Sequence, residues 1–493
     1  MTGAVARRWP PAPVVIYILA VVLPVHLSLG GLVLTSVRIF LLAMVLPLAL
    51  RLLSGRCGRL MIVDALMVAH ILWATLALAV NNPNQVIEQA GSVGLEFIGG
   101  YLVGRVLIRS REEFIALSRF LVLLMLCILP FTLFETMTGR SLVLEVLNKL
   151  PGLSAQKPVY TEMRMGLHRV QFTFAHPIHF GLFASVTLSL CYVGLKGVIP
   201  DTGRILAAAL IAMSGFLALS SGALLAIFLQ IGLFAWAFMF RRISWRWWLL
   251  LGMLALAYVV VDLLSNRRPI HVFMSYATFS AHTAYWRMLI FDWGMINVWA
   301  NPVFGLGLND WVRASYMRSG SMDNFWLLMA VRYGIPGFLL VAAGYLLALF
   351  RIMFRDFNSD PALANVRRAW VFTFVGLTFT LFTVHVWGNL YSFVFFIFGA
   401  GIWMIDAVPG GEVLPAAATP GQDARALRLR RKDAAVPAYT RFPGGAAPVT
   451  RAAAPPPTAR PPPAPATLRP AAPAASRPLD DLPASRFAPQ GRA

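Results

Sequence analysis

Apolar runs of about 20 residues recur along this chain from residue 13 to residue 406, separated by short polar breaks. A run of that length crosses a hydrocarbon core about 30 Å thick when it folds as an α-helix. Hydrophobic residues make up 58% of the 493 positions and charged residues only 13%, which is far more apolar than a soluble domain. The sequence therefore predicts an all-α polytopic membrane protein.

Hydropathy and run length predict about twelve transmembrane helices. We read the first run as an uncleaved span, because no small-residue cleavage site follows it and the next run begins at once. The expected spans cover residues 13–30, 32–52, 61–80, 86–104, 113–134, 176–197, 204–219, 222–240, 247–264, 324–350, 369–387 and 389–406.

Arginine and lysine cluster in every second loop, which assigns those loops to the cytoplasm by the positive-inside rule. With twelve spans, both termini then lie in the cytoplasm. Two large loops, about residues 135–175 and 265–323, lie on the outer, periplasmic face. We expect the second of them, which precedes the tenth span, to contain short helices.

The composition changes after Asp406 to Ala, Pro, Gly and Arg, in stretches such as AAAPPPTARPPPAPATLRPAAPAA. Such a segment has too few large apolar residues to form a core. The sequence thus predicts a transmembrane domain over residues 1–407 and a disordered cytoplasmic tail over residues 408–493. The tail either lies against anionic lipid or serves as a docking arm for a partner.

Unbalanced arginines mark both outer loops, with Arg169 in the first and Arg267, Arg268 and Arg287 in the second. Long translocated loops tolerate such charges, which is the simpler interpretation. The alternative is that they bind an anion, because a guanidinium fork matches phosphate oxygens. With this placement, the net charge of +21 does not indicate a nucleic-acid partner. No Gly-rich phosphate loop, HExxH, GxSxG or CxxC motif occurs, so we expect no metal and no cofactor.

Three stretches on the outer side carry candidate functional residues. In HRVQFTFAHPIHFG, Pro177 suits the first turn of a helix, which makes His176 its expected N-cap, with Arg169 close by. Residues 284–300 are expected to form an amphipathic external helix that carries Arg287 and ends at Asn301-Pro302. The FGLGLN turn that follows is only a weak dinucleotide signal, because no strand precedes it.

The third stretch, SMDNFWLLMAVRYGIPG, begins the tenth span with an Asp-Asn pair. Asp323 is an expected helix N-cap, and a carboxylate at the interface also accepts a proton from a hydroxyl. Arg332 lies about two turns further on, before the GIPG break, and either lines the same cavity or marks a kink. Charges inside spans are usually paired, and we expect Arg38 to pair with Asp64.

Four stretches in order resemble the O-antigen ligase and O-antigen polymerase superfamily: RVQFTFAHPIHFG, SSGALLAIFL, YWRMLIFDWGMINVWANPVFGLGLNDW and DNFWLLMAVRYGIPGFLL. The resemblance implies a metal-independent glycosyltransferase at the outer face of the bacterial inner membrane. It also implies a polyprenyl-diphosphate-linked glycan as donor, a glycan as acceptor, and polysaccharide assembly proteins as partners.

The same resemblance implies roles for single residues. Arg169 and Arg287 match the family's motif arginines, which hold the diphosphate, and Arg267 or Arg268 is a third. His176 and Arg332 are expected to support this site.

Ligases of the family typically have a histidine followed by asparagine, with the histidine as the base, where this chain has Asp323 and Asn324. The resemblance therefore implies that Asp323 acts as base and that Asn324 orients it. This departure favours polymerisation of lipid-linked repeat units into exopolysaccharide or O-antigen-like polymer. The alternatives are a ligase that transfers the glycan to a lipid or protein, and a polysaccharide-related transporter or flippase.

Overall fold

A computed structural model of the chain describes residues 9–29, 32–151, 154–266, 269, 272, 281–317 and 319–409. These residues all belong to one of the chain's two structural units, residues 1–425. The expected disordered tail over residues 408–493 lies outside the described residues, apart from its first two positions. That expectation stays a prediction.

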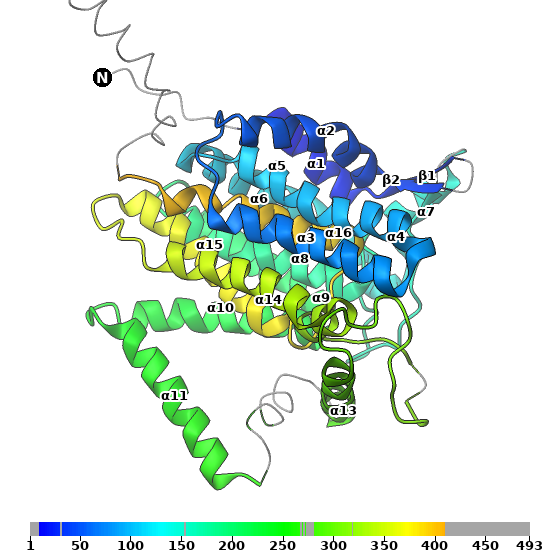
Figure 1. Ribbon diagram of the computed structural model, residues 1–493. Coiled ribbons are helices and arrows are strands. Elements are labelled where there is room, and N and C mark those ends of the chain that lie inside the picture. Colours follow the sequence, from blue (N-terminus) through cyan, green and yellow to red (C-terminus); the bar gives the residue numbers. More distant parts are fainter. Residues whose placement is uncertain are drawn as a thin grey trace, which may run out of the picture. The chain divides into compact units, whose positions relative to one another are not determined.

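The described part consists mainly of helices, and each of the twelve expected spans coincides with one helix or with helices that abut (Figure 1). They are α1 (Ala12–Val22), α2 (Ser36–Leu53), α3 (Ile62–Asn81), α4 (Val86–Gln89) with η2 (Ala90–Gly99) and α5 (Gly100–Leu107), α6 (Arg111–Thr138), α8 (Pro177–Ser189) with η3 (Leu190–Gly194), α9 (Asp201–Leu217), α10 (Ser221–Met239), α11 (Arg246–Leu264), α14 (Phe325–Met353), α15 (Pro361–Thr380) and α16 (Gly388–Gly399) with η4 (Ile402–Ile405). The other helices are η1 (Pro83–Gln85), α7 (Leu142–Lys149) and α13 (Ala281–Ala300).

Eight of the described helices are long and apolar enough to cross a membrane, namely α2, α3, α6, α8 with η3, α10, α11, α14 and α16 with η4. The protein is therefore a multi-pass membrane protein of the all-α class. The remaining expected spans correspond to α1, to the broken segment α4–η2–α5, to α9 and to α15. Because α1 has only 11 residues and α9 only 17, the count of twelve stays a prediction.

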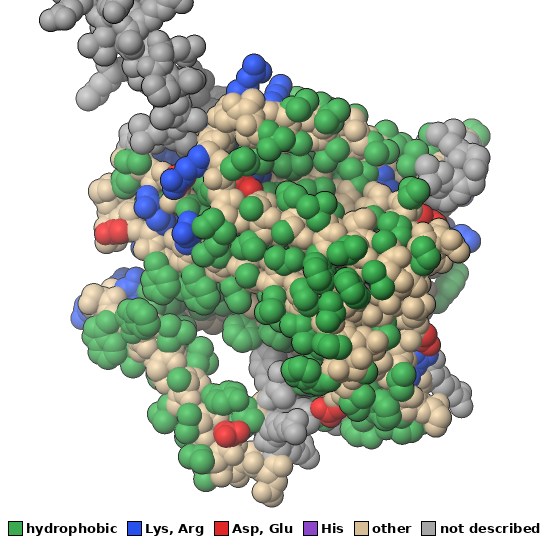
Figure 2. Space-filling model, viewed as in Figure 1, with side chains coloured by type: hydrophobic (Ala, Val, Ile, Leu, Met, Phe, Trp, Pro, Cys, Tyr) green, Lys and Arg blue, Asp and Glu red, His purple; other side chains and the backbone are tan. Residues whose placement is uncertain are grey.

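The surface of the described part suits contact with lipid. On the face shown in Figure 2, hydrophobic side chains cover most of the middle, and Lys and Arg gather toward one side. One stripe of α2 exposes Leu42, Leu46 and Leu50 at 55%, 64% and 57%. A contiguous apolar surface of this kind is unusual for a soluble monomer and is expected where hydrocarbon replaces water.

The N-terminal segment departs from the all-helical prediction, since the expected span 13–30 is helical only to Val22. Pro24 explains the stop, because it lacks an N–H group and disfavours the helical conformation of the residue before it. The following residues form the antiparallel strands β1 (Val25–Leu29) and β2 (Leu32–Thr35). The short strand β3 (Ser154–Ala155) pairs with the other edge of β1, so it ties the first outer loop to the N-terminal segment.

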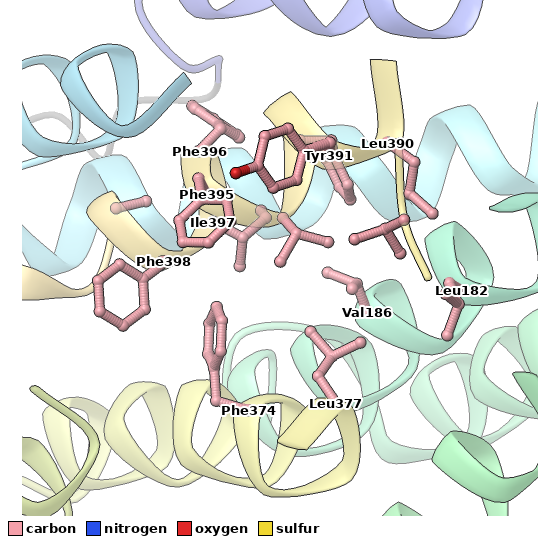
Figure 3. Close-up of a cluster of buried hydrophobic side chains, with 14 of the residues drawn as sticks. Leu182, Val186, Phe374, Leu377, Leu390, Tyr391, Phe395, Phe396, Ile397 and Phe398 are labelled. Carbon is pink, nitrogen blue, oxygen red and sulfur yellow. The ribbon is translucent and has the colours of Figure 1, made fainter. Parts of the chain in front are cut away.

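A buried apolar cluster joins helices that are distant in sequence. Side chains of α8, α15 and α16 meet in it, among them Leu182, Phe374 and Phe395 (Figure 3). Helix α16 also packs against α5, and the backbones of the two helices are in close contact there. A Cβ atom added at Gly104 would lie 2.0 Å from the carbonyl oxygen of Phe396. Small residues that permit such close approach are a common means of helix packing in membranes.

Two ion pairs, one of them buried and the other partly buried, differ from the expected one. Arg38 pairs with Glu96, with 2.8 Å between Nε and Oε1, and Asp64 pairs with Arg105 at 3.0 Å. The predicted Arg38–Asp64 pair is therefore wrong. Tyr101 also donates a hydrogen bond to Asp64, so this carboxylate has several donors around it. Paired in this way, the charges are tolerated within apolar surroundings.

Helix α14 is broken at Gly334, which has φ 72° and ψ 177° inside the helical run. The break leaves the carbonyls of Val331 and Arg332 without their helical donors, and two N–H groups of the FGLGLN turn replace them. Leu306 donates to Val331 at 2.8 Å, and Gly307 donates to Arg332 at 2.9 Å. The Gly-rich turn therefore docks against α14 and fixes the end of α13. These hydrogen bonds give the turn a structural role.

Candidate functional site

A buried carboxylate shapes the first outer loop. Glu135, at the end of α6, is 4% exposed and accepts hydrogen bonds from the N–H groups of Gln171 and Phe172 at distances of 2.9 to 3.2 Å. Phe172 has φ 54°, a left-handed conformation that is unusual for a side chain of its size. The carboxylate thus holds the chain between Arg169 and α8 in a fixed bend. Glu135 was not among the predicted site residues; its sequence signal is an acid directly after the apolar run 113–134.

Two arginines of this loop bind the turn between α9 and α10. Arg164 donates from Nη1 to the carbonyl of Leu219 at 2.8 Å, and Arg169 donates from Nε to the carbonyl of Ala218 at 3.4 Å. Burial, together with the charge of Arg164, lowers the pKa of Arg169 to about 10. With that pKa, Arg169 remains cationic at neutral pH. Arg164 was not among the predicted site residues.

His176 caps the N-terminus of α8, which confirms the prediction. Its Nδ1 atom accepts a hydrogen bond from the N–H of Ile178 at 3.2 Å. Burial is the main reason that the pKa of His176 falls to about 4. The positive charges of Arg169 and Arg164 lower this pKa further, and the negative charge of Asp323 raises it. The imidazole is therefore neutral at physiological pH, as its acceptor role requires.

Two further histidines surround an indole beside His176, and sequence analysis did not single them out as site residues. The Trp387 ring lies 4.0 Å from the ring of His179, 5.7 Å from that of His385 and 6.2 Å from that of His176, measured between centroids. Trp387 is 42% exposed, whereas His179 is 1% exposed. Burial and the charge of Arg332 lower the pKa of His385 to about 3. A partly exposed aromatic ring of this kind suits stacking on a sugar.

Arg287 is the most buried of the predicted site arginines that the structure describes. It lies on α13, is 7% exposed, and among the described residues its Nε and Nη1 atoms have no hydrogen-bond partner. Burial is the main reason that the pKa of Arg287 falls to about 10. The charge of Asp323 raises this pKa, and the charge of Arg164 lowers it. A buried cation without full hydrogen bonding is costly, and an anionic ligand would remove that cost.

The structure corrects the predicted cap of α14. The N-cap is Asn324, whose Oδ1 accepts from the N–H of Leu327 at 3.0 Å, and not Asp323. Asp323 is exposed and accepts a hydrogen bond from the hydroxyl of Ser321 at 2.9 Å. Because capping uses Oδ1 of Asn324, only its amide nitrogen remains for a ligand. That Nδ2 atom is buried and has no partner among the described residues.

The other predicted residues lie around this centre or outside the described part. Arg332 is partly buried next to the break in α14, and its charge acts on His385. Arg267 and Arg268 lie outside the described residues. The external helix, predicted over residues 284–300, is confirmed as α13. At 20 residues it is longer than the short helices expected for this loop.

The charges of the two outer loops act on one another. Asp323 favours the charged forms of His176 and Arg287, while Arg164 disfavours the charged forms of both. The first outer loop, α13 and the start of α14 thus bring their ionisable groups within electrostatic range. A cluster of this composition is suited to bind a multiply charged anion next to an exposed carboxylate.

The neutral form of His176 predicts a stability loss in acid. Its folded-state pKa of about 4 lies below the ordinary 6.5, so the stability linked to it is present above pH 6.5 and is lost as the pH falls toward 4. We expect His176 to contribute a fall in melting temperature as the pH drops below 6.5, in addition to the effects of other titrating groups. His176→Asn retains a capping oxygen without the titration and should drop less. Equal acid profiles for the two proteins would exclude His176 as the source.

Comparison with known protein families gives a match over part of the chain. Residues 206–342 match the family model described as O-antigen ligase. The matched segment runs from α9 into α14, so it contains Arg287, Asp323, Asn324 and Arg332, whereas Arg169 and His176 precede it. A search of curated proteins finds no match.

Proposed function

This multi-pass membrane protein carries a domain of the O-antigen ligase family, and from that premise we propose that it polymerises lipid-linked oligosaccharide repeat units. The donor is a glycan on a polyprenyl diphosphate, and the acceptor is the end of another glycan. The reaction takes place at the outer face of the bacterial inner membrane, with both termini in the cytoplasm. The product is an exopolysaccharide or an O-antigen-like polymer.

The observation that carries this proposal is the buried guanidinium of Arg287, two of whose nitrogens have no hydrogen-bond partner among the described residues and whose charge is coupled to Arg164 and Asp323. Outside the cytoplasm no nucleotide sugar is available, so the energy of the reaction has to reside in the donor's own diphosphate bond. Departure of the diphosphate builds negative charge. Cations fixed in advance stabilise that charge more in the transition state than in the ground state.

The proposed step is one displacement at the anomeric carbon. The acceptor hydroxyl oxygen forms the new bond to that carbon, and the bond from the carbon to the diphosphate oxygen breaks. The electron pair leaves with the lipid diphosphate, which Arg169 and Arg287 hold. Asp323 takes the hydroxyl proton, and the Nδ2 group of Asn324 donates a hydrogen bond to an oxygen of the bound substrate.

A ligase that transfers the finished glycan to a lipid or protein is the second candidate, because the matching family model is named for that activity. Its chemistry is the same and only the acceptor differs. The family match also favours either enzyme over a transporter or flippase. We favour the polymerase because the family's ligases have histidine where this chain has Asp323.

The test separates these functions by product length. Purified protein in nanodiscs is given one lipid-linked repeat unit as both donor and acceptor. A polymerase is expected to produce a ladder of products that differ by one repeat. A single transfer to an added lipid or protein acceptor, without a ladder, would replace the polymerase by the ligase. Movement of unaltered substrate across vesicles, without any transfer, would favour the transporter.

A further inference from the structure

Helix α11 is the most exposed of the long apolar helices in the described part of the chain. None of its 19 residues is buried, although it is apolar enough to cross a membrane. Figure 1 shows it turning away from the end of α10, and Figure 2 shows hydrophobic side chains along most of its length. An apolar surface of this extent is expected to lie against lipid hydrocarbon and not against water.

The first turn of α11 meets the bundle through aromatic rings. The ring of Trp247 lies 5.6 Å from that of Phe372 on α15, and the ring of Trp248 lies 6.0 Å from that of Phe354, measured between centroids. Trp245 and Trp248 are 57% and 64% exposed. Exposed tryptophans at the end of an apolar helix are typical of the membrane–water interface. The start of α11 therefore lies at the depth of the lipid headgroups.

These contacts bring together cations from three segments of the chain. Arg246 begins α11, and Arg368 lies one turn before Phe372 on α15. Burial and the positive charge of Arg246 lower the pKa of Arg368, so the two guanidinium groups act on each other. Asn365 accepts a hydrogen bond from Nη1 of Arg368 at 3.4 Å and donates one to the carbonyl of Lys196 at 3.5 Å. The segment that carries Lys196 thus adjoins the two arginines.

The hydrogen bonds of the two arginines go to neutral groups among the described residues. Arg246 donates from Nη1 to the carbonyls of Arg241 and Ile243, at 3.4 and 3.2 Å. Its Nε atom is buried and has no partner in the same part of the chain. The first turn of α11 has neither a side-chain cap nor an acidic residue, so its N–H groups add to the positive potential. This arrangement suits an anion at headgroup depth.

We propose that Arg246 and Arg368 bind the phosphate of an anionic phospholipid, whose acyl chains extend along the exposed surface of α11. A zwitterionic lipid fits less well, because its ammonium group would lie among like charges. A soluble phosphate contacts the cations but gains nothing from the apolar surface. The bound lipid bridges α11 and α15 and offsets the repulsion between the two arginines. The site is separate from the residues proposed for sugar transfer.

Competition between two lipids tests the headgroup. Purified protein is given equal amounts of phosphatidylglycerol and phosphatidylcholine with the same acyl chains, and the retained lipids are counted by native mass spectrometry. We expect the wild type to prefer phosphatidylglycerol. Arg246→Ala and Arg368→Ala should each reduce this preference about fivefold, the effect of one cation near an anionic headgroup. Arg51→Ala is the matched control and should keep the preference, since Arg51 is an exposed arginine in the last turn of α2, which Figure 1 shows far from α11.

The lysine variants and free phosphate sharpen this test. Arg246→Lys and Arg368→Lys keep the charge and should keep most of the preference, whereas an equal loss in the alanine and lysine variants would contradict a charge-based site. Millimolar inorganic phosphate should leave the lipid bound. Its displacement by phosphate would show that the cluster binds the free anion instead. Equal retention of both lipids by the wild type, or full preference in both alanine variants, would overturn the proposal.

Photolabelling locates the site without any sugar transfer. A phosphatidylglycerol with a photoreactive group beside its phosphate is expected to label the start of α11 and of α15 in the wild type and in Arg51→Ala. Labelling of both segments should fall in Arg246→Ala and Arg368→Ala. Labelling spread evenly over the exposed helices of all four proteins would mean that the lipid has no specific site. Because no glycan takes part, this result stands whichever product the protein forms.

Discussion

Replacing Arg287 by alanine is expected to reduce the rate of repeat-unit transfer by a factor of about 10² to 10³, the usual effect of removing one preorganised group that stabilises transition-state charge. Arg287 is buried on α13 and is coupled to Arg164 and Asp323. Arg287→Lys keeps the charge but loses the two-pronged donor geometry, so it should lie between alanine and wild type. Transfer rates are measured with the ladder assay at saturating donor.

The same variant should not lose stability, which distinguishes a functional arginine from a structural one. Two nitrogens of Arg287 have no hydrogen-bond partner among the described residues, so its removal relieves a desolvation cost. We expect the melting temperature of Arg287→Ala to equal or exceed that of the wild type. Arg313→Ala is the matched control, since this arginine of the same outer segment pairs with the exposed Asp310 and should retain full activity. Full transfer by Arg287→Ala would remove it from the site.

The helices of the fold were predictable because the length of an apolar run can be read from consecutive residues. Ion pairs and helix contacts between residues distant in sequence cannot be read in this way. Asp64 and Glu96 are both acidic residues within predicted spans, so either could pair with Arg38. The packing of α2 against η2 brings Arg38 to Glu96. The close approach of α5 and α16 depends in the same way on Gly104 meeting a backbone nearly 300 residues further along, at Phe396.

The site shows the same division. His176 as N-cap followed from the proline after it, which is a local signal. At the start of α14, both Asp323 and Asn324 are favoured caps, and hydrogen bonds from Phe325 to the carbonyls of Leu381 and Val384 fix the register that selects Asn324. That selection leaves Asp323 exposed and free of the capping role. His385 gave no signal, because a single histidine in an apolar loop is usually structural.

The break in α14 is expected to be the most sensitive backbone position of the outer half. A Cβ atom added at Gly334 would lie 2.1 Å from the carbonyl oxygen of Val303, and the residue has φ 72°. Gly334→Ala should therefore cost on the order of 3 kcal/mol, from backbone strain and from weakened hydrogen bonds between α14 and the FGLGLN turn. Thermal unfolding in nanodiscs and limited proteolysis of residues 301–309 measure this loss.

Gly388→Ala separates the two causes. Gly388 also has a positive φ, 58°, but an added Cβ atom meets nothing within 4 Å, so this variant should show only the strain, about 1 kcal/mol. Because the turn fixes the end of α13, Gly334→Ala should also lower transfer activity by displacing Arg287, whereas Gly388→Ala should not. Equal losses of stability and activity in the two variants would mean that docking of the turn adds nothing. A larger loss of transfer activity at Gly334 would show that the interrupted helix helps to hold Arg287 near Asp323, which lies at the end of the same outer loop.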